Sequence, residues 1–73
     1  MSKEAFMIEE ITKEVVLLLM DEYKMNLHDA LRTLYTSDTY ARLTETKNGL
    51  YTQSTAYVYE YLENEIKTGK MNP

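Results

Sequence analysis

The side chains that could do chemistry in this sequence are few and poorly placed for it. The chain has 73 residues, no cysteine and a single histidine, His28. Asp29 follows His28 directly, but neighbouring residues of a helix point about 100° apart, so this spacing does not make a histidine–carboxylate pair. A nucleophilic serine would need His28 as its base, and nothing in the sequence supports such a pair. We expect His28 to face solvent in the first turn of a helix.

The sequence also gives little indication of a metal-binding or phosphate-binding site. Glu10 and Glu14 lie one helical turn apart and could touch a divalent cation, but two carboxylates without a further ligand are typical of a solvated face. Gly49 and Gly69 are the only glycines, which excludes glycine-rich phosphate loops. We therefore predict a protein that is not an enzyme, with no catalytic residues, no cofactor, no metal site and no small-molecule substrate.

The composition further limits the kinds of protein that this chain could be. The net charge is −4, most of the excess acid lies in residues 1–25, and no basic stripe for nucleic acid is visible. The strongest apolar run, from Val15 to Met20, is too short to span a bilayer, and no cleavage site of a signal peptide follows it. Since a cysteine-free chain also fits a reducing compartment, we expect a single cytoplasmic helical domain over residues 1–73.

The elements that must position any site are four predicted helices, at about 3–24, 27–36, 38–47 and 53–68. Ser2 and Asn26 are expected to cap the first two, and Ser37 or Asp38 the third. The fourth begins near Thr52 or Ser54 and ends at Gly69. These features predict an all-α fold, a compact bundle of four helices in which the first is longest.

Asn48-Gly49 is also a strong β-hairpin signal. We favour a helix end at this dipeptide, because residues 40–45 lack the period-two alternation of a strand.

The first helix has apolar side chains on two faces. One stripe is predicted to face the core and consists of Ile8, Ile11, Val15, Leu18 and Leu19. Phe6, Leu17 and Met20 lie nearly opposite. Either later helices cover this second face, or it contacts another molecule, which would help a chain so short to stabilise its fold.

The last helix carries an apolar arc at Tyr57, Val58, Tyr61, Leu62 and Ile66. Glu65 falls inside that arc and is expected at the edge of the core, in water or beside a cation. Tyr57 and Tyr61 are expected at the edge of a thin core, whereas Tyr59, on the margin of the arc, is an interface candidate.

Two functions remain open. The first is a protein-interaction module that self-associates or binds a partner protein, with a contact surface at Phe6, Leu17, Met20 and Tyr59. The alternative is a small helix-turn-helix DNA-binding regulator using residues 27–47, with Arg32, Arg42 and Lys47 as its cations. Asp38 and Glu45 are unfavourable for DNA contact.

Three stretches taken together resemble a group of short bacterial proteins of unknown function. They are residues 16–22, residues 29–40 around Asp29-Ala30-Leu31 and Ser37-Asp38-Thr39-Tyr40, and residues 49–59 around Gly49-Leu50-Tyr51-Thr52-Gln53-Ser54 and Tyr57-Val58-Tyr59. Some small proteins of this wider class are encoded beside toxin-like genes, so the resemblance implies an antitoxin or accessory binding role. It assigns no role to any residue.

Overall fold

The computed structural model describes residues 2–69, and these form four α-helices with no β-strand among them. The first helix is the longest, which confirms the predicted all-α bundle. Two short 3₁₀ turns join the third helix to the fourth. In chain order the elements are α1 (Lys3–Glu22), α2 (Leu27–Tyr35), α3 (Asp38–Thr44), η1 (Thr46–Asn48), η2 (Leu50–Thr52) and α4 (Thr55–Thr68).

Side-chain caps begin all four helices. Ser2 Oγ accepts a hydrogen bond from the backbone N–H of Ala5 at 3.0 Å, and Asn26 Oδ1 accepts one from Asp29 at 2.8 Å. Ser37 and Ser54 do the same for the third and fourth helices. Each cap satisfies one of the amides that the first turn of a helix leaves unpaired. The predicted starts of these helices are therefore confirmed to within two residues.

Helix ends are less accurately predicted. The third helix stops at Thr44 rather than residue 47, because Asn48 holds a separate turn: its Nδ2 donates to the carbonyl of Arg42 and its Oδ1 accepts from the amide of Leu50. Gly49 follows in the left-handed region at φ 74°, which glycine adopts without strain. Gly69, at φ 79°, ends α4 as expected.

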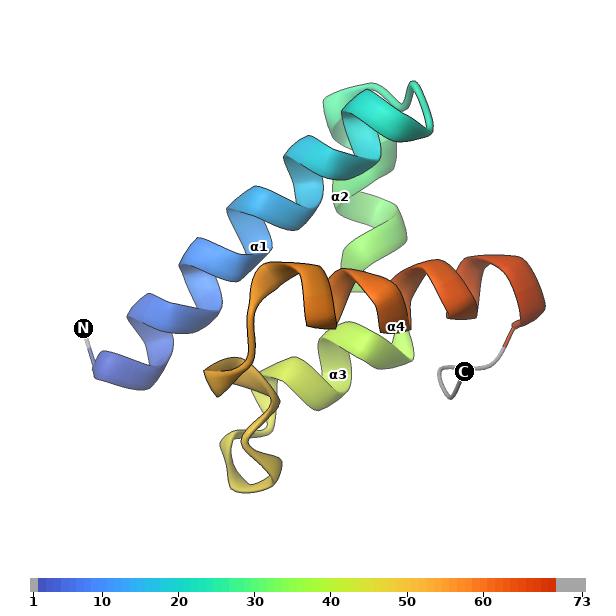
Figure 1. The fold of residues 1–73 in the computed structure, drawn as a ribbon. Coiled ribbons are helices and arrows are strands. Elements are labelled where there is room, and N and C mark those ends of the chain that lie inside the picture. The colour runs from blue at the N-terminus through green and yellow to red at the C-terminus, as the bar shows by residue number, and fades with distance from the viewer. Residues whose placement is uncertain (1, 70–73) are drawn as a thin grey trace.

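One core joins all four helices. Figure 1 shows α2 turning back from the end of α1 at an angle to it, with α4 in front of the lower end of α2 and α3 below α4. α1 packs against α2, α4 and η2, and α3 packs against α4. Ile11, Val15 and Leu19 of the predicted stripe are buried, whereas Ile8 and Leu18 are half-buried beside them. The buried apolar residues are Ile11, Val15, Val16, Leu19, Ala30, Leu34, Leu43, Leu50, Val58, Tyr59 and Leu62.

Glu65 has a different role from the one expected. Its carboxylate accepts hydrogen bonds from the backbone N–H of Asp38 at 2.7 Å and of Thr39 at 3.0 Å, and from the Thr39 hydroxyl at 2.8 Å. The partners are thus the first amides of α3, not water or a cation. A carboxylate in this position satisfies unpaired amides and favours the positive end of the helix dipole. Glu65 therefore fastens α4 to α3.

Candidate functional site

Two of the three predicted contact residues on α1 are more than half exposed, and the third is partly covered by its own chain. Leu17 is 60% exposed and Phe6 is 56% exposed, while Met20 is half-buried against the core. Large apolar side chains scattered singly on a surface need no explanation, but a contiguous patch does. The neighbours of these three residues therefore decide whether a site exists.

Leu17 and Met20 border an apolar groove between α1 and α2, with a volume of about 310 Å³. Leu27 and Tyr35 lie along its α2 side and are 54% and 52% exposed. We call this surface the α1–α2 groove; its lining consists of Glu9, Thr12, Lys13, Val16, Leu17, Met20, Leu27, Leu31 and Tyr35.

The width of the apolar arc on α2 explains how the groove forms. Ala30 and Leu34 are fully buried, and Leu27, Leu31 and Tyr35 continue the arc around the helix. This arc is wider than the face that α1 covers, so its outer part remains open. The sequence pattern shows the arc but not how much of it α1 covers, so the exposure of Leu27 and Tyr35 is a finding of the structure.

Phe6 belongs to a different part of the surface. It lies eleven residues before Leu17, about 16 Å along the helix axis. There it lines a second hollow of about 270 Å³ with Met7, Ile11 and Tyr51. The structure therefore brings Leu17 and Met20 together but leaves Phe6 apart from them.

The structure corrects the expected position of Tyr59. Its side chain is only 6% exposed and belongs, with Val58 and Leu62, to the buried face of α4, which packs against both α1 and α3. The Tyr59 hydroxyl donates a hydrogen bond to Glu22 at 3.2 Å. Tyr57, which was expected at the core edge, is instead nearly half exposed. Tyr59 thus belongs to the α1–α4 contact and not to an open surface.

The Tyr59–Glu22 contact predicts how stability depends on alkaline pH. Burial, and then the hydrogen bond to Glu22, raise the pKa of Tyr59 above its ordinary value of 10. Because the folded state favours the neutral phenol, this stabilisation is complete below about pH 10 and is lost as the pH rises further. Tyr59→Phe keeps the ring but cannot ionise. We expect its free energy of unfolding to fall less steeply above about pH 10 than that of the native sequence.

Urea unfolding measured at a series of alkaline pH values tests this dependence. Tyr51→Phe is the matched control, because it removes a phenol from η2 rather than from the α1–α4 contact. Equal slopes for Tyr59→Phe and the native sequence would show that the phenol does not couple folding to pH.

Charges of opposite sign flank the α1–α2 groove. Glu10, Glu14 and Asp21 lie within about 60° of Leu17, on the side of α1 away from the groove. On α2 the two residues next beyond the apolar arc are His28 and Arg32, whose side chains meet at 3.3 Å. We call Glu10, Glu14 and Asp21 the acidic row, and His28 with Arg32 the basic lip.

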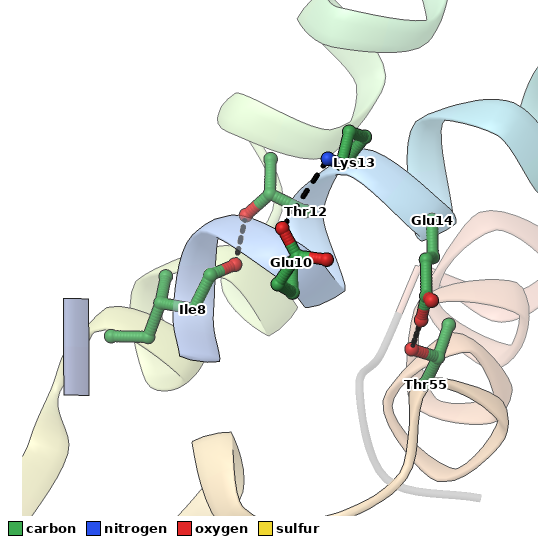
Figure 2. Close-up of polar contacts among 6 residues, drawn as sticks. All are labelled: Ile8, Glu10, Thr12, Lys13, Glu14 and Thr55. Atoms are coloured by element: carbon green, nitrogen blue, oxygen red, sulfur yellow. Dashed lines mark hydrogen bonds and ion pairs between the residues drawn. The ribbon is translucent and has the colours of Figure 1, made fainter. Parts of the chain in front are cut away.

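Figure 2 shows how two members of the acidic row are held. Glu10 forms an ion pair with Lys13 at 3.3 Å, and Glu14 points toward the start of α4, where it accepts a hydrogen bond from Thr55. Lys13 lines the groove, so the ion pair offsets a positive charge at its edge. The groove itself is therefore mainly apolar, and the flank charges outside this ion pair are Glu14 and Asp21 on α1 and Arg32 on α2.

The start of α3, within the residues 27–47 considered for DNA contact, is acidic and already bonded to α4. In a helix-turn-helix the start of the second helix approaches the bases and phosphates. Here the start of α3 carries Asp38 and is covered by the carboxylate of Glu65. Two acids at that point would repel phosphate.

Groups suited to catalysis or metal binding are sparse among residues 2–69. No set of three or more histidine, aspartate or glutamate side chains is placed there to hold a metal ion. A polar hollow of about 160 Å³ between α3 and α4 is lined by Arg42, Gln53, Tyr57 and Tyr61, without a nucleophile–base pair. In the same part of the chain, no helix has both the length and the apolar character needed to cross a membrane.

Comparison of the chain with protein-family models, with curated proteins and with solved structures finds no match.

Proposed function

We propose that this chain is a non-catalytic protein-interaction module that self-associates through the α1–α2 groove. The observation that carries the proposal is the open apolar surface where Leu17, Leu27 and Tyr35 are each more than half exposed. Burying such side chains stabilises an association by about 25 cal/mol for each Å² of apolar area. A small domain gains relatively more from this than a large one, because its own core is thin.

A second copy of the chain fits this surface better than an arbitrary partner. The groove lies directly beside the ridge formed by Leu17, so one copy offers both a projecting and a receiving surface. The acidic row and the basic lip on its flanks also have opposite signs, which suits a symmetric dimer in which each surface meets a copy of itself. Shape and charge therefore both favour self-association.

The proposal includes the cellular compartment in which the module acts. We place the module in the bacterial cytoplasm, in keeping with the resemblance of its sequence to short bacterial proteins and with its lack of cysteine. An antitoxin-like role, which that resemblance implies, would be one use of such a module. A partner protein of that kind would compete with the second copy for the groove.

The Leu17→Glu variant tests the proposal. Placing a carboxylate at the centre of the apolar contact removes the burial of a leucine and adds an unpaired charge. We expect the dimer dissociation constant to rise by about tenfold to several hundredfold, equivalent to about 1.4–3.5 kcal/mol. The measurement is sedimentation equilibrium from micromolar to millimolar protein.

Ile66→Glu provides the matched control, since it makes the same kind of change at an exposed apolar residue of α4, outside the groove. It should leave the dissociation constant unchanged. A native sequence that stays monomeric at millimolar concentration would contradict the proposal, as would equal effects of the two substitutions.

A further inference from the structure

The charged flanks of the groove also define how two copies would be arranged. This inference rests on the proposed self-association and adds the orientation of the partner and the residues that pair across the interface. The starting point is the order of side chains across the surface: basic lip, apolar groove, Leu17 ridge, acidic row. In a symmetric dimer, each of these four features must contact one of the same four features on the other copy.

Only one direction of the twofold axis satisfies both shape and charge. If the axis runs along α1, the two flanks exchange places, so the basic lip of one copy meets the acidic row of the other. The Leu17 ridge of each copy then enters the groove of its partner. If the axis runs across α1, each flank meets its own equivalent, ridge meets ridge, and the acidic rows face one another. Like charges placed together oppose association.

The position of α2 along α1 identifies which residues meet. α2 begins beside the end of α1 and returns toward its start, where Tyr35 lines a hollow with Ile8 and Thr12. Arg32 lies one turn before Tyr35 and so is level with the middle of α1, the height of Glu14. An axis along α1 preserves height, and it therefore sets Arg32 of one copy opposite Glu14 of the partner subunit.

We propose that the second copy binds with its α1 parallel to the first, each Leu17 in the other's groove, and Arg32 paired with the partner's Glu14 on both sides. An arginine–carboxylate pair suits this role, because the guanidinium group can donate two parallel hydrogen bonds to one carboxylate. Lys13 is the cation nearest the axis in this arrangement. Its ion pair with Glu10 within the same chain reduces the repulsion between its two copies.

Two charge reversals and their mixture test the arrangement. Arg32→Glu alone places two acids against each other at both ends of the interface, and Glu14→Arg alone places two arginines there. We expect each variant to weaken its own dimer by about tenfold or more. In an equimolar mixture, the new glutamate of one variant faces the new arginine of the other, while the native Arg32 and Glu14 still pair at the opposite end. The mixture should therefore recover the dimer as a heterodimer, measured by sedimentation velocity.

Thr55→Ala controls for the hydrogen bond that Glu14→Arg removes within its own chain, and it should leave the dimer unchanged. Far-ultraviolet circular dichroism checks that every variant keeps its helices. If both reversals dimerise as well as the native sequence, or if mixing restores nothing, the parallel arrangement is wrong even though Leu17→Glu still dissociates the dimer. If the native sequence itself does not self-associate, the proposed function fails together with this inference.

Discussion

Replacing Leu19 with alanine is expected to reduce the free energy of unfolding by about 2–5 kcal/mol. Leu19 is fully buried where α1 meets the other helices, so the substitution both removes buried methyl groups and leaves a cavity. A chain of 73 residues has a total stability of about 4–11 kcal/mol, and the loss is therefore a large share of it. Urea unfolding followed by circular dichroism at low protein concentration measures the change.

Leu17→Ala is the matched control for this experiment. It makes the same substitution two residues earlier on the same helix, at a side chain that is 60% exposed. The stability of the monomer should then change by no more than about 0.5 kcal/mol. If Leu17→Ala lowers the free energy of unfolding as much as Leu19→Ala does, then the assignment of Leu17 to the surface of α1 and of Leu19 to its buried side is wrong.

The second large effect is expected at Glu65, where Glu65→Ala removes three hydrogen bonds to the start of α3. The Thr39 side chain is fully buried, so its hydroxyl has no solvent to replace the lost partner. Hydrogen bonds to a charged group contribute about 1.5–3 kcal/mol, and we expect a total loss of about 2–3 kcal/mol. In the Glu65→Ala variant, solvent exchange of the α3 backbone amides should also accelerate more than that of the α1 amides. Hydrogen exchange monitored by NMR would measure this difference.

Glu60→Ala serves as the comparison, since Glu60 is an exposed carboxylate of the same helix. Its removal should leave both the stability and the exchange of α3 nearly unchanged. Equal losses at positions 60 and 65 would show that the cap on α3 has no energetic role.

The helices were predictable because their signals are local. Ser2, Asn26, Ser37 and Ser54 each cap an amide three residues later, so the feature that starts the helix is contained in one turn of sequence. Gly69 ends α4 for an equally local reason, the left-handed conformation that glycine adopts readily. Such patterns do not depend on where the rest of the chain lies.

The surroundings of Tyr59 and Glu65 depend on packing, and the sequence did not specify them. α4 contacts α1 on one side and α3 on another, which moves the buried face to Val58, Tyr59 and Leu62 and exposes Tyr57. Glu65 follows Val58 and Leu62 at helical spacing, on the same buried stripe. A carboxylate on such a stripe, together with an open helix start at Ser37-Asp38-Thr39, was the available signal for a cap between distant parts of the chain.

The sequence indicated the α1 side of the groove but not the groove itself. The second apolar face of α1 was evident from Leu17 and Met20, and the structure leaves Leu17 exposed as that prediction requires. The α2 side of the groove depends on how much of α2 the first helix covers. Packing geometry determines this coverage, and the sequence period does not. The exposure of Leu27 and Tyr35 is therefore evident only from the three-dimensional structure.

The most direct test of self-association through the groove is the concentration dependence of the backbone amide NMR spectrum. As the protein is concentrated from micromolar to millimolar, we expect the largest shifts at Leu17, Met20, Leu27, Leu31 and Tyr35, with little change at Tyr57 and Ile66. A spectrum that does not change with concentration, or one whose changes centre on α4, would contradict the account.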